Sequence, residues 1–249
     1  MKSHPLLEAR ELTVRFGGLT AVDAVSAAFG AGELVGIIGP NGAGKTTFFN
    51  ALSGINAPTS GELYTGGQRL TGAAPHRFAE HGVARSFQTP RVFHELSVAA
   101  NVGFGLQCAG RHRKDVPPWL RDEASILALI GLGEHQHRPA SALTPSQQRL
   151  LEVGMSLATR PRVLLLDEVA AGLSELELRQ MALLITRLRS ELDLTVIWIE
   201  HAVGILLRHV ERVLVLHQGR KIADGTPAEV VRNAEVVEAY LGDEMVETA

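Results

Sequence analysis

Residues 39–46 constrain the fold of this chain more than any other stretch. Their sequence is GPNGAGKT, and they follow an aliphatic run at residues 34–38 and precede a predicted helix at residues 46–53. Glycines let backbone N–H groups close around phosphate oxygens, Lys45 can reach the β and γ phosphates of a nucleotide, and the Thr46 hydroxyl can bind Mg²⁺. The strand, loop and helix together predict a phosphate-binding loop, or P-loop. The alternative is a glycine-rich hairpin, which needs a chance match of about one in a hundred at average residue frequencies.

Further short apolar runs predict the strands of a buried parallel sheet. They occupy residues 12–16, 163–166, 194–199 and 212–216, and helical patterns such as residues 176–191 separate them. Because parallel strands are covered on both faces, continuous apolar runs between helices are typical of an α/β protein.

The middle of the chain has a different pattern. Between about residues 90 and 160 the periodicity becomes helical, interrupted by a polar stretch with paired prolines at residues 111–118. We therefore expect a helical lobe inserted into the sheet domain.

Composition excludes several classes of protein. A hydrophobic fraction of 45%, a charged fraction of 20% and a net charge of −3 give no general attraction to nucleic acid, so nucleic acid is not an expected partner. The single Cys108 cannot form an internal disulfide, and residues 1–11 lack the apolar core of a signal peptide, so we expect a cytoplasmic location. No apolar run approaches the roughly 20 residues that cross a bilayer, so any membrane association should come through a partner.

Two acidic residues follow the run at residues 163–166. Beside a phosphate-binding loop, Asp167 would hold Mg²⁺, and Glu168 would orient or deprotonate the attacking water. Without the loop, such a pair is usually only a solvated strand end. His201, at the end of the next strand, would sense the γ-phosphate, although a lone histidine there is otherwise an ordinary hydrogen-bonded residue.

The order of these motifs resembles the ATP-binding cassette (ABC) family over nearly the whole chain. The resemblance implies a single ABC domain over residues 1–249 with the P-loop NTPase fold: a RecA-like parallel-sheet core, an antiparallel β subdomain and an inserted α-helical subdomain. It implies a catalytic core at residues 1–88 and 161–249, a helical subdomain at residues 89–160, and ATP and Mg²⁺ as cofactors.

Individual residues match the motifs of that family. Phe16, in the stretch VRFGG, matches an aromatic that stacks on adenine, with an ordinary strand aromatic as the alternative. Gln88, in RSFQTP, matches a glutamine that contacts both Mg²⁺ and the membrane subunit. The implied nucleotide contacts are Asn41, Gly42, Ala43, Gly44, Lys45, Thr46 and Thr47. The implied metal ligands are Thr46, Gln88 and Asp167, and the implied hydrolytic residues are Glu168, His201 and Gln88.

The family signature, usually LSGGQ, corresponds to LTPSQQR at residues 143–149. Thr144, Ser146 and Gln147 would contact the ATP held by the opposite subunit. Ser146 stands where the family has a glycine whose backbone approaches that ATP, and Val169 replaces the proline that commonly follows the catalytic glutamate. We expect phosphate binding by this subunit to be intact and its contribution to the partner's site to be altered.

Four stretches resemble the ATP-binding subunits of branched-chain amino acid importers. They are FGGLTAV at residues 16–22, QTPRVF at residues 88–93, AAGL at residues 170–173 and VVEAYLG at residues 236–242. Urea and short-amide importers share these blocks, and so, more distantly, do lipopolysaccharide-export ATPases. An importer would supply two transmembrane permease subunits, a second ABC ATP-binding subunit and an external solute-binding protein, and would hold this chain at the inner face of the cell membrane. Ser146 favours a heterodimer, because a homodimer would carry two altered sites.

Other functions have less support from the sequence. Soluble ABC ATPases that act on DNA or the ribosome usually carry a long coiled coil or tandem cassettes, whereas this chain has no sustained heptads and one P-loop. A non-catalytic subunit would explain Ser146 but not the intact Lys45, Asp167 and Glu168.

A metal site at His135 and His137 is a further alternative. Histidines at alternate positions in a polar loop are usually solvated.

Overall fold

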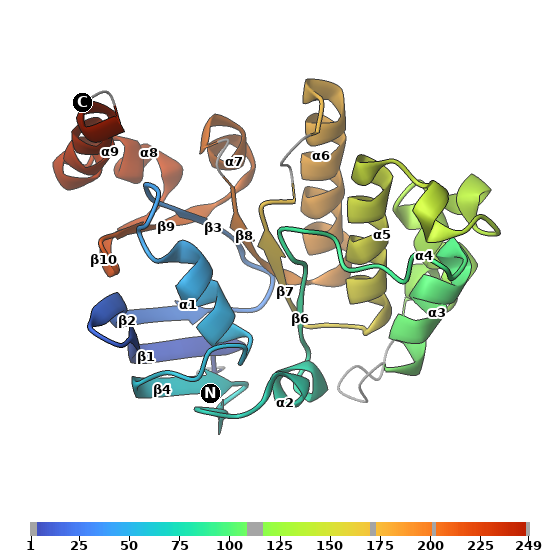
Figure 1. The fold of residues 1–249 in the computed structure, drawn as a ribbon, viewed down its shortest axis with the longest axis horizontal. Coiled ribbons are helices and arrows are strands. Elements are labelled where there is room, and N and C mark those ends of the chain that lie inside the picture. The colour runs from blue at the N-terminus through green and yellow to red at the C-terminus, as the bar shows by residue number, and fades with distance from the viewer. Residues whose placement is uncertain (1–3, 109–116, 170–172, 201–202, 248–249) are drawn as a thin grey trace.

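The computed structural model describes residues 4–108, 117–169, 173–200 and 203–247, which form two sheets and a set of covering helices (Figure 1). The larger sheet has the strand order β10-β9-β3-β8-β7-β6 and is parallel except for β10. Its strands are β3 (Leu34–Ile38), β6 (Val83–Arg85), β7 (Val163–Asp167), β8 (Thr195–Ile199), β9 (Arg212–His217) and β10 (Arg220–Gly225). The smaller sheet is antiparallel, with the order β2-β1-β4-β5. Its strands are β1 (Leu7–Phe16), β2 (Leu19–Phe29), β4 (Ser60–Thr65) and β5 (Gln68–Arg69).

The helices divide between the sheets and a separate lobe. Those packed around the sheets are α1 (Lys45–Leu52), α2 (Pro75–Glu80), α6 (Glu175–Leu192), α7 (Val203–His209), α8 (Pro227–Val231) and α9 (Ala234–Glu247). The lobe contains α3 (Val98–Gln107), α4 (Glu123–Leu129) and α5 (Pro145–Ala158), with 3-10 turns at Pro118–Leu120, Gly133–His135 and Ala140–Ala142. Among the described helices, none has the length and apolar character to cross a membrane.

The larger sheet separates two hydrophobic cores, which explains its continuous apolar strands. In β3, Leu34 and Ile38 belong to one core, and Val35 and Ile37 belong to the other. The second core lies between the sheet, α1 and the antiparallel sheet. Every residue of β3, β7 and β8 is buried. Because these strands are parallel, the polar residues at their carboxyl ends lie along one edge of the sheet.

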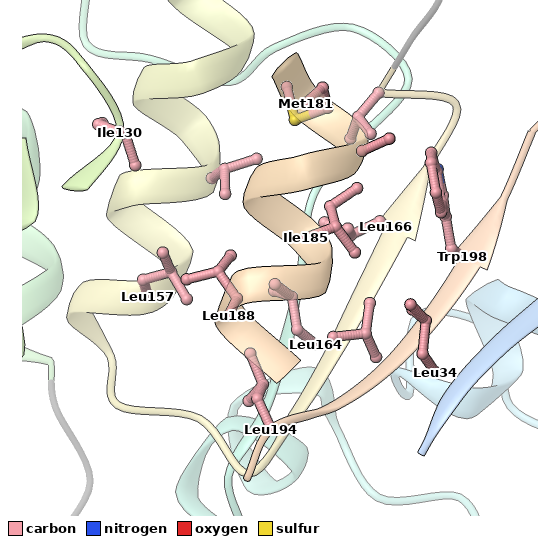
Figure 2. Packing of buried hydrophobic residues seen from close by; sticks show 14 of the residues in the cluster. Leu34, Ile130, Leu157, Leu164, Leu166, Met181, Ile185, Leu188, Leu194 and Trp198 are labelled. Carbon is pink, nitrogen blue, oxygen red and sulfur yellow. The ribbon is translucent and has the colours of Figure 1, made fainter. Parts of the chain in front are cut away.

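The first core fixes the helical lobe against the larger sheet. Figure 2 shows Met181, Ile185 and Leu188 of α6 between α5 and the sheet, with Leu166 and Trp198 on the strands behind them. All these side chains are buried, so α5 is joined to the ends of β7 and β8 through a packed layer. The parallel sheet predicted from the sequence is therefore confirmed, except that residues 12–16 lie in β1 of the antiparallel sheet. Helices α3, α4 and α5 lie within the stretch for which the sequence predicted a helical lobe. The polar stretch predicted at residues 111–118 lies mostly outside the described residues.

Candidate functional site

The loop between β3 and α1 needs glycine at two positions. Gly39 has φ 154°, and a Cβ there would lie 2.1 Å from the Leu216 carbonyl oxygen. Gly44 has φ 95° at the start of α1, and a Cβ there would lie 2.3 Å from the Ala21 carbonyl oxygen. The neighbouring backbone thus holds the loop closely, with the first N–H groups of α1 directed into the space above it.

Lys45 is buried in this loop, where its ammonium donates to the carbonyls of Gly39 at 2.5 Å and Pro40 at 2.8 Å. Burial lowers the pKa of Lys45, while the charges of Glu168 and Asp167 oppose that shift. The cation therefore lies beside the two carboxylates at the end of β7, held in a position from which it can meet phosphate oxygens.

A cavity of about 590 Å³ opens over the loop. Its lining includes Phe16, which is 51% exposed, and the buried Glu168. Every predicted loop contact lines it as well: Asn41, Gly42, Ala43, Gly44, Lys45, Thr46 and Thr47. The remaining lining comes from the start of β2 and the β9–β10 turn, which the motif pattern did not identify: Leu19, Thr20, Ala21, Gln218 and Gly219.

Glu168 has a backbone conformation that is unusual for a residue with a side chain. Its φ is 49°, in the left-handed region that costs a non-glycine residue about 1–2 kcal/mol. Two hydrogen bonds hold the backbone of Glu168, and a third holds its side chain. The Glu168 amide donates to Ile199 O at 3.0 Å, Arg149 donates to Glu168 O at 2.9 Å, and Gln88 Nε2 donates to the Glu168 carboxylate at 2.6 Å. A strained backbone of this kind is typical of functional positions. The bond from Gln88 to Glu168 was not predicted from the sequence, which assigned Gln88 to Mg²⁺ and the membrane subunit.

Asp167 is paired with a buried arginine. Arg85 at the end of β6 donates to the Asp167 carboxylate at 2.7 Å, and their side chains are 7% and 3% exposed. The same guanidinium donates to Asn50 Oδ1 at 2.6 Å and Ser53 Oγ at 3.0 Å. One oxygen of Asp167 is thereby fixed by a partner from a neighbouring strand.

The signature residues lie away from the P-loop cavity. Thr144 caps α5 in a reciprocal arrangement with Gln147, and the Ser146 hydroxyl is 3.0 Å from that of Thr144. Ser146 and Gln147 line a different cavity, of about 440 Å³, together with Glu177 of α6. Hydrogen bonds from Ser146 and then Ser174 lower the pKa of Glu177 to about 2. The Ser146 side chain is thus engaged with α6 and does not reach this chain's own P-loop.

Residues 22–171, more than half of the chain, match the family model described as ABC transporter. The chain belongs to this family. Residues 220–246 also match the model described as branched-chain amino acid ATP-binding cassette transporter.

Curated relatives match the cassette almost from end to end. It is 40% identical over 256 residues to the high-affinity branched-chain amino acid transport ATP-binding protein BraF of Pseudomonas aeruginosa, covering 97% of this chain and 99% of BraF. It is 39% identical over 253 residues to LivG of Escherichia coli, which has the same description, with the same coverage.

Solved structures agree with the fold of the cassette. An ATP-binding cassette of an ABC transporter in its ADP conformation has a TM-score of 0.82 at 29% identity, with 95% of this chain and 98% of that chain covered. A nucleotide-free ATP-binding cassette also has a TM-score of 0.82, at 28% identity, with 94% and 98% covered. The predicted P-loop NTPase fold is confirmed.

Two sets of predicted residues have other outcomes. His201 lies outside the residues that the structure describes, as do residues 170–172 after Val169. The His135 ring lies within hydrogen-bonding distance of Gln147 and Arg138, and His137 is exposed. No cluster of three or more potential metal ligands occurs in the described part of the cassette.

The motif pattern missed three charged residues of the cassette that hold its functional segments. Arg85 and Glu152 each interrupt an apolar stretch, which is a sign of a buried charge with a partner. Arg149 is the last residue of the polar signature stretch, and nothing in its spacing predicts its bond to Glu168. Their partners are distant in sequence, so only the fold identifies them.

Proposed function

We propose that this chain is the ATP-hydrolysing subunit of an importer for branched-chain amino acids. The gathering of Lys45, Thr46 and Glu168 around one cavity is the observation that carries the hydrolytic role. The proposed solute is based on the similarity to transport ATP-binding proteins for those amino acids, which are 39–40% identical over nearly the whole chain.

In the proposed mechanism the loop amides and Lys45 bind the phosphates of ATP, and the exposed Phe16 stacks on the adenine ring. Thr46, Gln88 and Asp167 would hold Mg²⁺, because hydroxyl, amide and carboxylate oxygens suit this hard cation. Mg²⁺ would neutralise charge on the phosphates. Glu168 then orients the attacking water and accepts its proton, while Gln88 holds the Glu168 carboxylate. His201 is proposed as the residue that senses the γ-phosphate.

We further propose that the complex contains two permease subunits and that this chain docks onto the membrane part through its helical lobe, residues 89–160, near Gln88. A cavity of about 710 Å³ lies beside that segment, with Phe87 and Arg91 in its lining next to apolar residues such as Ile55 and Phe104. A permease segment that binds in this cavity would therefore contact the Gln88 region directly. A solute-binding protein would act on the other side of the membrane.

The second ATP-binding subunit is proposed to be a different chain. In such a heterodimer, this P-loop faces an unaltered signature, and only the partner's ATP meets Ser146. The proposed result is one fast and one slow hydrolytic site.

Detergent extraction of native membranes tests the whole assignment. Purification through this chain should recover polytopic proteins and a second cassette, and Glu168→Gln should retain ATP and accumulate a nucleotide-bound dimer, because glutamine keeps the shape but not the base. Recovery only with ribosomes or DNA would contradict the transporter assignment, and normal turnover by Glu168→Gln would place the base elsewhere.

A further inference from the structure

Helix α5 is bonded to two separate segments of the hydrolytic site. It begins at the signature cap Thr144, and Arg149, a turn later, donates to the Glu168 carbonyl at 2.9 Å. Three residues further on, Glu152 accepts hydrogen bonds from the backbone amides of Phe87 at 3.2 Å and Arg91 at 2.9 Å. Residues three apart lie on one face of a helix, so a single face of α5 holds both segments.

Burying the carboxylate of Glu152 costs free energy unless hydrogen bonds compensate, so its buried position indicates that it has specific partners. It is 4% exposed within a helix whose neighbouring residues Leu151 and Val153 are fully buried. Burial raises the pKa of Glu152, and the hydrogen bonds from the amides of Arg91 and Phe87 oppose that shift. A residue that only filled space here would be apolar, whereas each oxygen of Glu152 accepts from one amide.

The segment that Glu152 holds has no regular secondary structure from residue 86 to residue 93. At its two ends the amide of Ser86 donates to Leu165 O of β7 at 2.9 Å and that of Phe93 to Asn101 Oδ1 at 2.7 Å. A partly buried amide without an acceptor is disfavoured, so the amides between these ends need other partners. Phe87 and Arg91 are the two points at which α5 supplies an acceptor. Gln88 lies between them, and its amide nitrogen is 2.6 Å from the Glu168 carboxylate.

We propose that Glu152 is a positioning residue for Gln88, whose flanking backbone it ties to the signature helix. Movement of α5 then carries Gln88 toward or away from Glu168, while Arg149 links the same helix to the Glu168 backbone. The signature of this subunit is therefore connected within the chain to its own hydrolytic residues. The consequence for turnover rests on the proposed ATPase function, but the backbone connection does not.

Hydrogen exchange in the full-length chain tests the connection directly. Glu152→Gln keeps the size of the side chain but places an NH₂ group against one amide, so the amides of Phe87 and Arg91 should exchange about tenfold faster. Glu152→Asp keeps the charge but is too short to reach both amides, and it should also lose protection. Glu95→Gln is the matched control, an exposed carboxylate in the same lobe, and should leave exchange unchanged. Unchanged protection in both Glu152 variants would overturn the proposal.

A double-mutant cycle separates positioning from a general structural effect. In the membrane complex, Glu152→Gln should lower kcat at least tenfold with less than a twofold change in KM for ATP, because the P-loop is untouched. In a Gln88→Ala background, the same substitution should change kcat less than twofold, since Glu152 acts through Gln88. Full additivity of the two substitutions would overturn the proposal. If no polytopic partner is recovered, the proposed function fails while the exchange result still decides the role of Glu152.

Discussion

Replacement of Arg85 by methionine should destabilise the cassette more than any single surface substitution. Methionine keeps much of the length of the side chain but has no donor for Asp167, Asn50 or Ser53. The Arg85 and Asp167 side chains are 7% and 3% exposed, so the Asp167 carboxylate would remain buried without its guanidinium. Breaking a buried ion pair from one side costs about 3–5 kcal/mol.

This loss can be measured by urea and thermal unfolding of the nucleotide-free chain. For a domain of this size, about 3–5 kcal/mol corresponds to a Tm lower by roughly 6–20 °C. Arg179→Met is the control, because Arg179 forms an i,i+4 pair with Glu175 in which the side chains are 68% and 75% exposed. Such a pair contributes about 0.3–0.5 kcal/mol. Equal losses in the two variants would refute the assignment of Arg85 and Asp167 as a coupled buried pair.

Four other substitutions have defined outcomes. Lys45→Ala removes the cation that meets the phosphates and should lower ATP hydrolysis about a hundredfold or more; unchanged activity would refute the P-loop assignment. In the assembled heterodimer, Ser146→Gly should speed only the partner's site in single-turnover assays, by up to about a hundredfold, whereas Glu168→Gln should abolish most turnover; if Ser146→Gly changes nothing, serine is an adequate substitute for glycine. Burial acts to raise the pKa of Asp224, but hydrogen bonds, first that from Arg212, outweigh it and the pKa lies below its usual value of 3.8. The carboxylate therefore stabilises the fold above that pH and loses this effect as the pH falls through the lowered pKa. Asp224→Asn should reduce the free energy of unfolding at pH 7 but not below that transition, and an equal deficit at every pH would contradict the linkage.

The strands of the parallel sheet could be predicted because strands that are buried on both faces have continuous apolar sequences. Strand β3 has the predicted bounds, and β7 extends one residue beyond its run. Strand β2 was not predicted, since its sequence LTAVDAVSAAF mixes small, polar and apolar residues in a sheet with one face partly exposed. Strand β6 has three residues and ends in Arg85, so neither length nor hydrophobicity identifies it.

In the candidate site, too, the contiguous motif could be predicted from the sequence, whereas contacts between distant residues could not. The P-loop is a contiguous motif whose chemistry depends on local backbone, and its residues all line one cavity. The bonds from Arg85 to Asp167 and from Phe87 to Glu152 join residues 82 and 65 positions apart, and composition or periodicity contains no information about such pairs. The left-handed backbone of Glu168 is likewise fixed by distant partners, Ile199 and Arg149, and cannot be predicted from local sequence.

The most direct test of the proposed function is solute uptake by the complex purified through this chain and reconstituted in lipid vesicles. With ATP on the side of the cassettes and the solute-binding protein on the other, leucine, isoleucine or valine should accumulate, and Glu168→Gln should abolish the accumulation. A complex that hydrolyses ATP but moves none of these amino acids, or that moves them equally well with Glu168→Gln, would contradict the account.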